Sequence, residues 1–441
     1  MTVLADSSPS IEQRLSDGEV APGFRLITLP MGVQDVVTIA GSFYGGDIFS
    51  PTENQAIADI TAAMLDKGTR SRDKFEIGAL LEDVGAAIRF NSDDYRVNFS
   101  ARCLKSNLPM VIELLAEQLM EPAFHKADLA SLKKRVLGNL KRQLESTDEQ
   151  ARIAFSQLLY GPRHPNYIPG IESQMAEVEA LTCEDLAAFH RQHYGRGSIA
   201  LVATGDLDRA ELEQNLAAQW GRWPQVDITP PSLDDHRADL TTPGREKFVT
   251  LQEKTSVNLL MGMAVGIDRE HPDYMALVVA TFILGGNFSA RLMTTVRDEA
   301  GLTYGIGSSI GGAGEGKDGF WAIHGTFAPP LLATGQAATL EQLDRWLGDG
   351  VTAEELAAKK TTITGSYQVG LASTKGMAGA ILNVVERGRE LSYLDTYPDD
   401  VRALDLEQVN GVIGRYLDRD RLVLVAAGSI DEQGEPLAPA S

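Results

Sequence analysis

Arg297 and Tyr304 are the two side chains in this sequence best suited to chemistry on a peptide. They lie in the segment LGGNFSARLMTTVRDEAGLTYGIGSSI, residues 284–310. A guanidinium and a phenol can both donate hydrogen bonds to the carbonyl oxygen of an extended peptide, or to the oxyanion that forms from it. Spacing alone favours a plainer interpretation, in which Arg297 pairs with Asp298 or Glu299 on the surface and Tyr304 packs in the core.

The residues around this pair predict a helix that turns into a strand. Two glycines break a preceding helix, and Ser289 is a suitable N-cap for the next one, which carries an apolar stripe. Gly301 ends that helix, and the run LTYGIGSSI continues as a strand. Arg297 is therefore expected near the end of the helix and Tyr304 near the start of the strand. A turn of this kind can bring both side chains to one side.

The histidines suggest no catalytic or metal site. The chain has seven, at positions His125, His164, His190, His193, His236, His271 and His324. Only His190 and His193 are close, three residues apart on a predicted helix with no glutamate placed to act as a base. We interpret both as solvent-facing residues of that helix. No Gly-x-Ser-x-Gly elbow and no Cys-His arrangement is evident either.

The segment GGAGEGKD, residues 311–318, resembles a phosphate-binding loop but fails two of its requirements. The pattern needs Ser or Thr after the lysine, whereas Asp318 follows Lys317 and would repel phosphate. The segment also lies between two strand-like runs rather than before a helix. We interpret it as a flexible hairpin loop.

Length and composition indicate a globular protein of two or three domains. The chain has 441 residues, more than one ordinary core supports, with 43% hydrophobic and 23% charged residues. Its net charge of −21 argues against a nucleic-acid partner, because phosphates require a basic surface. We interpret that charge as a solvated acidic exterior.

Cysteine usage and hydropathy predict a cytoplasmic protein without membrane association. The only cysteines, Cys103 and Cys183, are far apart, which excludes a disulfide framework and suggests a reducing compartment. The N-terminal residues show no signal-peptide pattern, and no apolar run is long enough to cross a bilayer.

Strand-like and helical segments alternate irregularly, which predicts an α+β fold with largely antiparallel sheets packed under helices. Residues 24–30 and 36–46 read as strands, and the runs AAIRF and YRVNFSARCL flank a turn-forming NSDD as a hairpin. Helical patterns follow at residues 53–66, 74–84, 107–120 and 126–145.

The chain also repeats itself. Residues 181–208 align without gaps on residues 404–431, and both read as a helix, a short turn and an apolar strand that ends in glycine. The Pro- and Asp-rich stretch near residues 223–244 reads as a linker between two homologous domains. The predicted division is a polar tail (1–20), an N-terminal domain (21–225), a linker (226–245), a C-terminal domain (246–432) and a C-terminal tail (433–441).

Residues 284–310 strongly resemble the second-domain motif of the pitrilysin/insulinase (inverzincin) zinc metallopeptidases, in which GG-x-x-S-x-RL precedes LR-x-x-x-GL-x-Y. The resemblance implies that Arg297 and Tyr304 bind substrate. It covers almost the whole chain and is best to the processing-peptidase branch, whose two-domain subunits work as dimers enclosing a chamber. That branch also carries a glycine-rich turn where this chain has residues 311–319, which implies a role for this loop in guiding substrate.

The same resemblance implies that the zinc site is lost. In active members an HFLEH sequence precedes M-L-x-K-G-T; its histidines ligate zinc and its glutamate activates the bound water. Matching MLDKGT at residues 64–69 places Asp59 at the first histidine, Ala62 at the glutamate and Ala63 at the second histidine. The third ligand of the family is a glutamate in a V-x-x-E-E-like stretch, where Gly138 and Asn139 replace the acids here. The chain is therefore expected to bind no metal and to have no catalytic residues of its own.

Taken together, the motifs predict a non-catalytic, substrate-binding subunit of a heterodimeric zinc metallopeptidase. Arg297 and Tyr304 would act at the zinc site of a homologous partner that carries His-x-x-Glu-His, on a peptide or unfolded protein substrate. We expect no activity from this chain alone. Two alternatives stay open: a structural scaffold, like the core subunits of respiratory complexes with this fold, and a homodimeric peptide-binding pseudopeptidase. Retention of the Arg/Tyr pair weighs against the scaffold.

Overall fold

The computed structural model of the chain describes residues 9–230, 232 and 237–438. They form two compact units: unit 1 takes the described parts of residues 1–137, 175–231 and 366–398, and unit 2 takes those of 138–174, 232–365 and 399–441. The predicted domains are each one continuous stretch, so the two divisions differ. The reason is that residues 138–174 and 366–398 each carry a helix that packs on the sheet formed by the other half of the chain.

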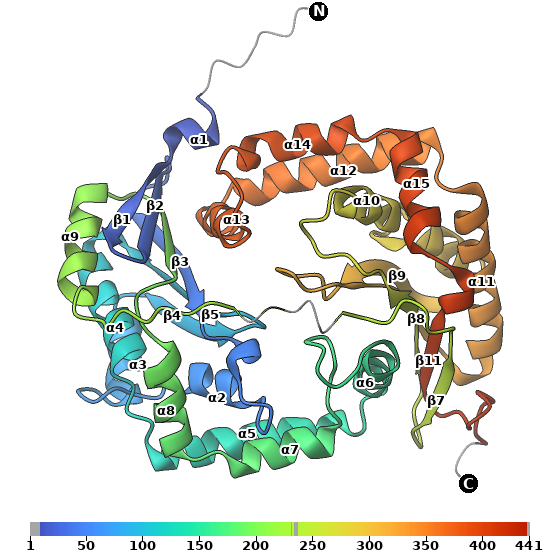
Figure 1. Cartoon of the computed structure of the whole chain (residues 1–441), viewed down its shortest axis with the longest axis horizontal. Coiled ribbons are helices and arrows are strands. Elements are labelled where there is room, and N and C mark those ends of the chain that lie inside the picture. The colour runs from blue at the N-terminus through green and yellow to red at the C-terminus, as the bar shows by residue number, and fades with distance from the viewer. Residues whose placement is uncertain (1–8, 231, 233–236, 439–441) are drawn as a thin grey trace, which may run out of the picture. The chain divides into compact units, whose positions relative to one another are not determined.

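Unit 1 contains a six-stranded sheet in the order β1-β2-β6-β3-β5-β4 (Figure 1). Its strands are β1 (Ser16–Ala21), β2 (Phe24–Pro30), β3 (Val36–Tyr44), β4 (Ala87–Ser92), β5 (Arg96–Leu104) and β6 (Ile199–Gly205). Only the pairing of β2 with β6 is parallel. The predicted hairpin is the antiparallel pair β4 and β5.

The prediction of a polar tail over residues 1–20 is wrong for its described part. A short helix, α1 (Ile11–Arg14), is followed there by β1, which pairs with β2 as an edge strand. The sequence SDGEVA of β1 lacks an apolar side because much of this edge strand is exposed. The predicted linker, 226–245, contains no helix or strand in its described residues.

Unit 2 contains a five-stranded sheet in the order β7-β11-β8-β10-β9. Its strands are β7 (Glu246–Thr250), β8 (Val257–Ala264), β9 (Thr303–Gly311), β10 (Phe320–Phe327) and β11 (Val423–Gly428). The pairing of β7 with β11 is parallel and the other pairings are antiparallel. The strand order and the parallel or antiparallel pairing of each neighbouring pair are the same as those of β2-β6-β3-β5-β4 in unit 1. The two largely antiparallel sheets packed with helices confirm the predicted fold class.

Each sheet buries both faces because its strands alternate apolar side chains between them. In unit 1, the face with Leu26 packs on α2 (Ile57–Met64), α4 (Leu108–Met120), α8 (Cys183–His193) and α9 (Arg209–Trp220). The opposite face, with Ile27, packs on α13 (Thr374–Glu386).

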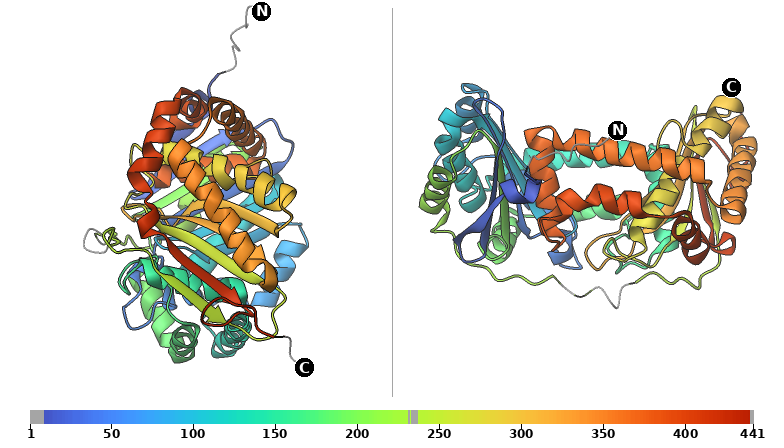
Figure 2. Two further views of the ribbon diagram at one scale, coloured as in Figure 1. Left: turned by 90° about the vertical axis from the view of Figure 1, so that its right-hand side faces the viewer. Right: turned by 90° about the horizontal axis from the view of Figure 1, so that it is seen from above.

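In unit 2, the face with Trp321 packs on α10 (Tyr274–Gly285), α11 (Leu332–Asp349) and α15 (Leu406–Tyr416). Figure 2 (left) shows α11, in orange, running across this face of the sheet, where Trp346 stacks on Trp321 with ring centres 5.7 Å apart. The other face, with Ala322, packs on α6 (Thr147–Leu159).

The remaining helices include those in which the chain passes from one unit to the other. These are α5 (Lys126–Gln143), α7 (Ile171–Ala180), α12 (Ala353–Leu371) and α14 (Tyr393–Ala403). In unit 1, α3 (Lys74–Glu82) precedes β4; in unit 2, a π-helix over Met293–Glu299 precedes β9. Among the residues that the structure describes, no helix is long and apolar enough to cross a membrane.

Candidate functional site

Arg297 and Tyr304 lie side by side at the surface of unit 2. Arg297 comes from the π-helix and Tyr304 from the start of β9, and Gly301 makes the turn between them with a φ of 64°. The guanidinium carbon lies 5.9 Å from the centre of the Tyr304 ring, within cation–π range. Tyr304 is 89% exposed, so the interpretation that it packs in the core is wrong. Arg297 does pair with Asp298, at 3.3 Å, as the plainer interpretation expected.

Phe288 completes this group and was not singled out from the sequence. Its ring centre lies 5.6 Å from the guanidinium carbon of Arg297, and the side chain is 76% exposed. The guanidinium is therefore within cation–π range of two aromatic rings. Stacking on a ring leaves guanidinium N–H groups available for hydrogen bonds. Such an arginine can donate to a carbonyl oxygen while the rings limit its motion.

Lys359 holds the loop that carries Phe288. Its ammonium group donates to Asn287 Oδ1 at 2.9 Å and to the carbonyl and hydroxyl oxygens of Ser289 at 2.8 Å each. Lys359 is only 5% exposed, and this burial lowers its pKa. The nearby negative charge of Glu355 offsets part of that decrease. Ser289 is thus a hydrogen-bond acceptor for Lys359, not the N-cap we predicted. A charged group buried with three acceptors fixes the loop strongly.

A second contact anchors the start of the following helix. Arg291 donates to both carboxylate oxygens of Glu355, at 2.8 to 3.1 Å, and to the carbonyl of Gly350 at 3.1 Å. Burial would raise the pKa of Glu355, but the hydrogen bonds from Arg291 and Thr352 outweigh it and the pKa is lowered. The serine and arginine of the GG-x-x-S-x-RL pattern thus both bind α12.

The helix expected to carry the zinc ligands is α2 in unit 1. Asp59 accepts a hydrogen bond from the Ser92 hydroxyl of β4. Although Asp59 keeps contact with solvent, protein atoms displace water from its carboxyl and raise its pKa, and Asp93 and Asp94 add to the increase. Ala62 is buried, and Ala63 packs at the edge of the core. Neither alanine offers a ligand or a base.

Gly138, the fourth of the predicted zinc-site positions, lies within α5. Only the end of the Arg142 side chain comes within 4.0 Å of the place a Cβ would occupy. In the described part of the chain, no group of three or more His, Cys, Asp and Glu side chains is arranged to hold a metal ion.

Two protein-family models match the chain. One, described as "Insulinase (Peptidase family M16)", covers residues 30–159, and the other, "Peptidase M16 inactive domain", covers residues 180–363. Together they span more than two thirds of the chain. This chain belongs to peptidase family M16.

Its relatives in the family include both proteases and a protein named as lacking peptidase function. "Uncharacterized zinc protease SCO5738" from Streptomyces coelicolor is 24% identical and covers 91% of this chain and 90% of its own. "Non-peptidase homolog YmxG" from Helicobacter pylori is 21% identical and covers 88% and 87%.

Among solved structures, the "peptidase M16 inactive domain from Pseudomonas fluorescens" has a TM-score of 0.83 at 23% identity, over 97% of this chain and 100% of that one. At two of the positions predicted for the zinc site, this M16 chain carries Ala62 and Ala63.

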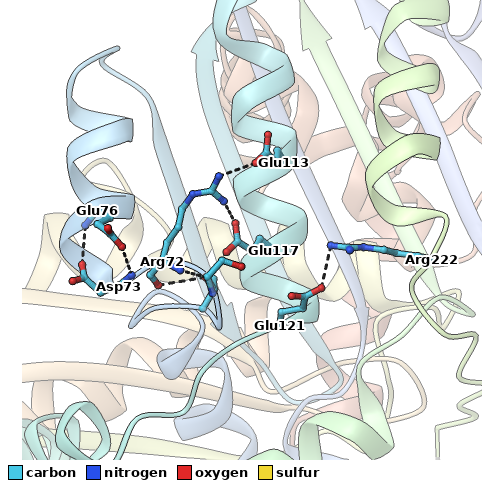
Figure 3. Close-up of polar contacts among 9 residues, drawn as sticks. Arg72, Asp73, Glu76, Glu113, Glu117, Glu121 and Arg222 are labelled. Carbon is cyan, nitrogen blue, oxygen red and sulfur yellow. Dashed lines mark hydrogen bonds and ion pairs between the residues drawn. The ribbon is translucent and has the colours of Figure 1, made fainter.

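The exit from α2 keeps a structural role in this M16 chain. Gly68 has a φ of 115°, and the Thr69 hydroxyl donates to the buried carboxylate of Glu117 on α4. Arg72 pairs with Glu117 and with Glu113, the latter at 2.9 Å (Figure 3). These contacts tie the MLDKGT segment to the neighbouring helix, which is a reason to retain it without a metal.

His190 and His193 are not the solvent-facing residues we predicted. His190 is buried, and its Nε2 atom lies 2.8 Å from the carbonyl oxygen of Leu119. Burial lowers the pKa of His190 to about 4, with smaller contributions from Arg191 and Arg70, so the ring is neutral at pH 7. His193 is half-buried against Phe189, with ring centres 4.4 Å apart. His236 lies outside the described residues.

The segment that resembles a phosphate loop is a β-hairpin connection between β9 and β10, as predicted. It is anchored rather than free: Asp318 is buried and accepts a hydrogen bond at 3.0 Å from buried His164. Asn166 donates to the carbonyl oxygens of Gly312 and Asp318, at 3.3 and 2.9 Å. Asp318 therefore replaces the phosphate-loop hydroxyl with a structural anchor.

Proposed function

We propose that this M16 chain is the non-catalytic, substrate-binding subunit of a heterodimeric zinc metallopeptidase. In this proposal, Arg297 and Tyr304 donate hydrogen bonds to the carbonyl oxygen of a bound peptide at the zinc site of a homologous His-x-x-Glu-His partner. The observation that carries the proposal is a guanidinium within cation–π range of two exposed aromatic rings, on a chain with alanines at two of the predicted zinc-site positions.

The exposure of these side chains supports a role in binding. Two aromatic rings that are 76% and 89% exposed add nothing to the core, and such apolar surface beside a cation suits contact with another molecule. The contacts of Lys359 and Arg291 with neighbouring residues also favour a binding role, because they fix the backbone that carries Phe288 and Arg297. A preorganised donor stabilises a developing oxyanion without reorganisation.

The substrate we propose is a peptide or partly unfolded protein held in an extended conformation. Tyr304 belongs to β9, one of the two edge strands of its sheet. An edge strand can accept an extended peptide as a further strand through backbone hydrogen bonds. A carbonyl of that added strand would lie within reach of the Arg297 and Tyr304 side chains.

The other parts of the proposal follow from this division of labour. Zinc, the base and the attacking water would belong to the partner, and this chain would bind no metal and hydrolyse nothing alone. The complex would act in the cytoplasm, without membrane or nucleic-acid partners. A homodimeric peptide-binding pseudopeptidase would use the same exposed pair without zinc, whereas a structural scaffold has no need of it.

The proposal is tested by comparing the chain alone, a zinc-bearing homologue alone and their mixture. For each sample, bound zinc and cleavage of a mixed peptide library are measured, together with the mass of the species in solution. We expect a one-to-one complex, zinc only in the homologue, and cleavage that requires both chains. Zinc and cleavage from this chain alone would contradict the proposal, and a dimer of this chain that binds peptide without cleaving it would favour the pseudopeptidase.

A further inference from the structure

Unit 1 has an open cavity of about 250 Å³ beside the end of α4 and the start of α8. Its floor is apolar and includes Phe124, Ala187 and the His190 ring. Phe124 meets His190 edge-on, with ring centres 5.7 Å apart, and His190 is held by the carbonyl of Leu119. Because His190 is neutral at pH 7, the floor carries no charge.

The rim of this cavity carries two arginines without ion-pair partners. Arg70 and Arg191 both line it, and neither forms a salt bridge or side-chain hydrogen bond with any residue that the structure describes. Arg70 follows α2 and Arg191 belongs to α8, so the two guanidinium groups come from different segments of the chain. The acid in the lining is Glu184, which leaves the rim with one net positive charge in a protein of net charge −21.

The other acids near this end of α4 are already paired. Glu121 binds Arg222 at 3.1 Å, and Glu113 and Glu117 bind Arg72 (Figure 3). They are therefore not available to neutralise Arg70, whose backbone N–H donates to the carbonyl of Glu121 at 3.0 Å. The bond to Glu121 also holds the backbone of Arg70 at the end of α4.

We infer that this cavity binds a carboxylate attached to an apolar group. The volume suits that class, since a cavity of about 150 Å³ holds benzene and the remainder has room for a short chain. Arginine binds carboxylates through paired N–H groups, and the apolar floor would cover the ring or chain. The site lies in unit 1 and is independent of the role proposed for Arg297 and Tyr304.

Cys183 provides a reporter inside the cavity. It lines the cavity and is half-buried, whereas the only other cysteine, Cys103, is buried at 5% exposure and its pKa is raised by burial to about 11. Alkylation by iodoacetamide, followed by mass spectrometry of the intact chain, should therefore report Cys183 first. A ligand in the cavity should slow this reaction.

The test uses the full chain with 3-phenylpropanoate and its neutral counterpart 3-phenylpropan-1-ol. We expect the carboxylate, when saturating, to slow alkylation of Cys183 at least fivefold and the alcohol to have little effect at the same concentration. Equal protection by both compounds, or by neither, would overturn the inference. The C-terminus of a peptide offers the same chemistry, so Gly-Gly-Phe and its C-terminal amide form a second pair, and the better-protecting carboxylate identifies the source.

Variants then assign the binding to the rim. Arg70→Ala and Arg191→Ala should each weaken binding of the carboxylate about tenfold, as expected for loss of a charge-assisted hydrogen bond. Glu184→Gln should strengthen it, and Arg14→Ala, an exposed arginine on α1, should leave it unchanged. Thermal unfolding of each variant checks that it folds. Unchanged binding in the Arg70→Ala, Arg191→Ala double variant would overturn the inference, as would equal weakening by Arg14→Ala.

Discussion

The edge strands β4 and β9 occupy the same place in two sheets of the same topology, yet they present different chemistry. Each follows a helix and a glycine with a φ of 64°, Gly85 in unit 1 and Gly301 in unit 2. Counting from these glycines, the positions of Arg297 and Tyr304 correspond to Leu81 and Ile88.

In unit 1 these two residues are partly buried against the core, whereas in unit 2 Tyr304 is almost fully exposed. The turn thus serves packing in unit 1, whereas in unit 2 it places an arginine beside an exposed tyrosine.

The helices α5 and α12 also differ at a pair of equivalent positions. An alignment of residues 129–147 on 356–374 brings together Ser146 and Ser373, the N-caps of α6 and α13. It also sets Leu132 against Lys359. Leu132 is part of the core of unit 1, while Lys359 is buried with three oxygen acceptors from the loop of Phe288. Unit 2 therefore has a buried charge where unit 1 has an apolar contact.

The largest effect is expected when Arg297, the residue that distinguishes the turn of unit 2 from that of unit 1, is replaced. In the complex with the zinc-bearing partner, Arg297→Ala should lower kcat/KM for peptide cleavage about 100- to 1,000-fold, the cost of removing one oxyanion donor. Leu81→Ala, at the equivalent position of unit 1, is the matched control and should change it less than about threefold. A similar loss in both variants, measured by steady-state kinetics, would remove the distinction between the turns.

A second difference lies between α8 and α15, where His190 corresponds to the apolar Ile413. The pKa of His190 is lowered to about 4 in the folded chain, so the unfolded chain binds the extra proton as pH falls below about 6.5. His190 should therefore cost stability as pH falls from 6.5 to 4, by up to about 3 kcal/mol.

Urea unfolding of the wild type and of His190→Gln at several pH values measures this cost. The difference between their free energies of unfolding should change as pH falls from 6.5 to 4. The exposed His125→Gln should instead follow the wild type. A His190→Gln variant that loses stability in parallel with the wild type would show that the pKa of His190 is the same in the folded and the unfolded chain.

Replacing Lys359 with the leucine of unit 1 should have a smaller effect. Lys359→Leu leaves the oxygens of Asn287 and Ser289 without their donor, and we expect about 2 kcal/mol of lost stability. Hydrogen exchange should show the loop of Phe288 opening more often. Lys134→Leu, at an exposed position of α5, is the control. Unchanged exchange in Lys359→Leu would mean that other contacts fix this loop.

The smallest effect is expected at Asp59. Its pKa is raised in the folded chain, so folding favours the protonated form and stability is lost as pH rises through the raised pKa. Asp59→Asn should therefore be more stable than the wild type at pH 7, by less than about 1 kcal/mol because the residue is exposed to screening solvent. At pH 3 the gain should vanish, and thermal unfolding at both pH values checks the sign.

Much of the fold could be read from local patterns, because alternation and turn residues are local signals. The pair β4 and β5 with its NSDD turn, and α4 and α5, follow the predicted segments closely. The exchange of α6 and α13 between the halves could not be predicted, since an amphipathic helix pattern does not say which sheet the helix covers. The π-helix was expected as an ordinary helix because the two differ by one residue in hydrogen-bond spacing.

The site was predictable where it depends on single residues and not where it depends on contacts. Arg297, Tyr304 and the alanines of α2 could be identified from motifs in the sequence alone. Phe288 carried only a weak signal, an aromatic residue between turn-forming Asn287 and Ser289. Lys359 carried none, because its contact with this loop spans about 70 residues of sequence. Long-range contacts of this kind come from the fold, not from local spacing.

Whether this chain contributes Arg297 to a zinc site on another chain can be measured in a single titration. A fixed amount of the zinc-bearing partner is titrated with this chain or with its Arg297→Ala variant, while binding and turnover are recorded together. We expect the wild type and the Arg297→Ala variant to bind the partner with similar affinity, at one to one. Turnover should rise to a plateau with the wild type and stay at least about 100-fold lower with Arg297→Ala. Equal plateaus at equal occupancy would contradict such a contribution by Arg297.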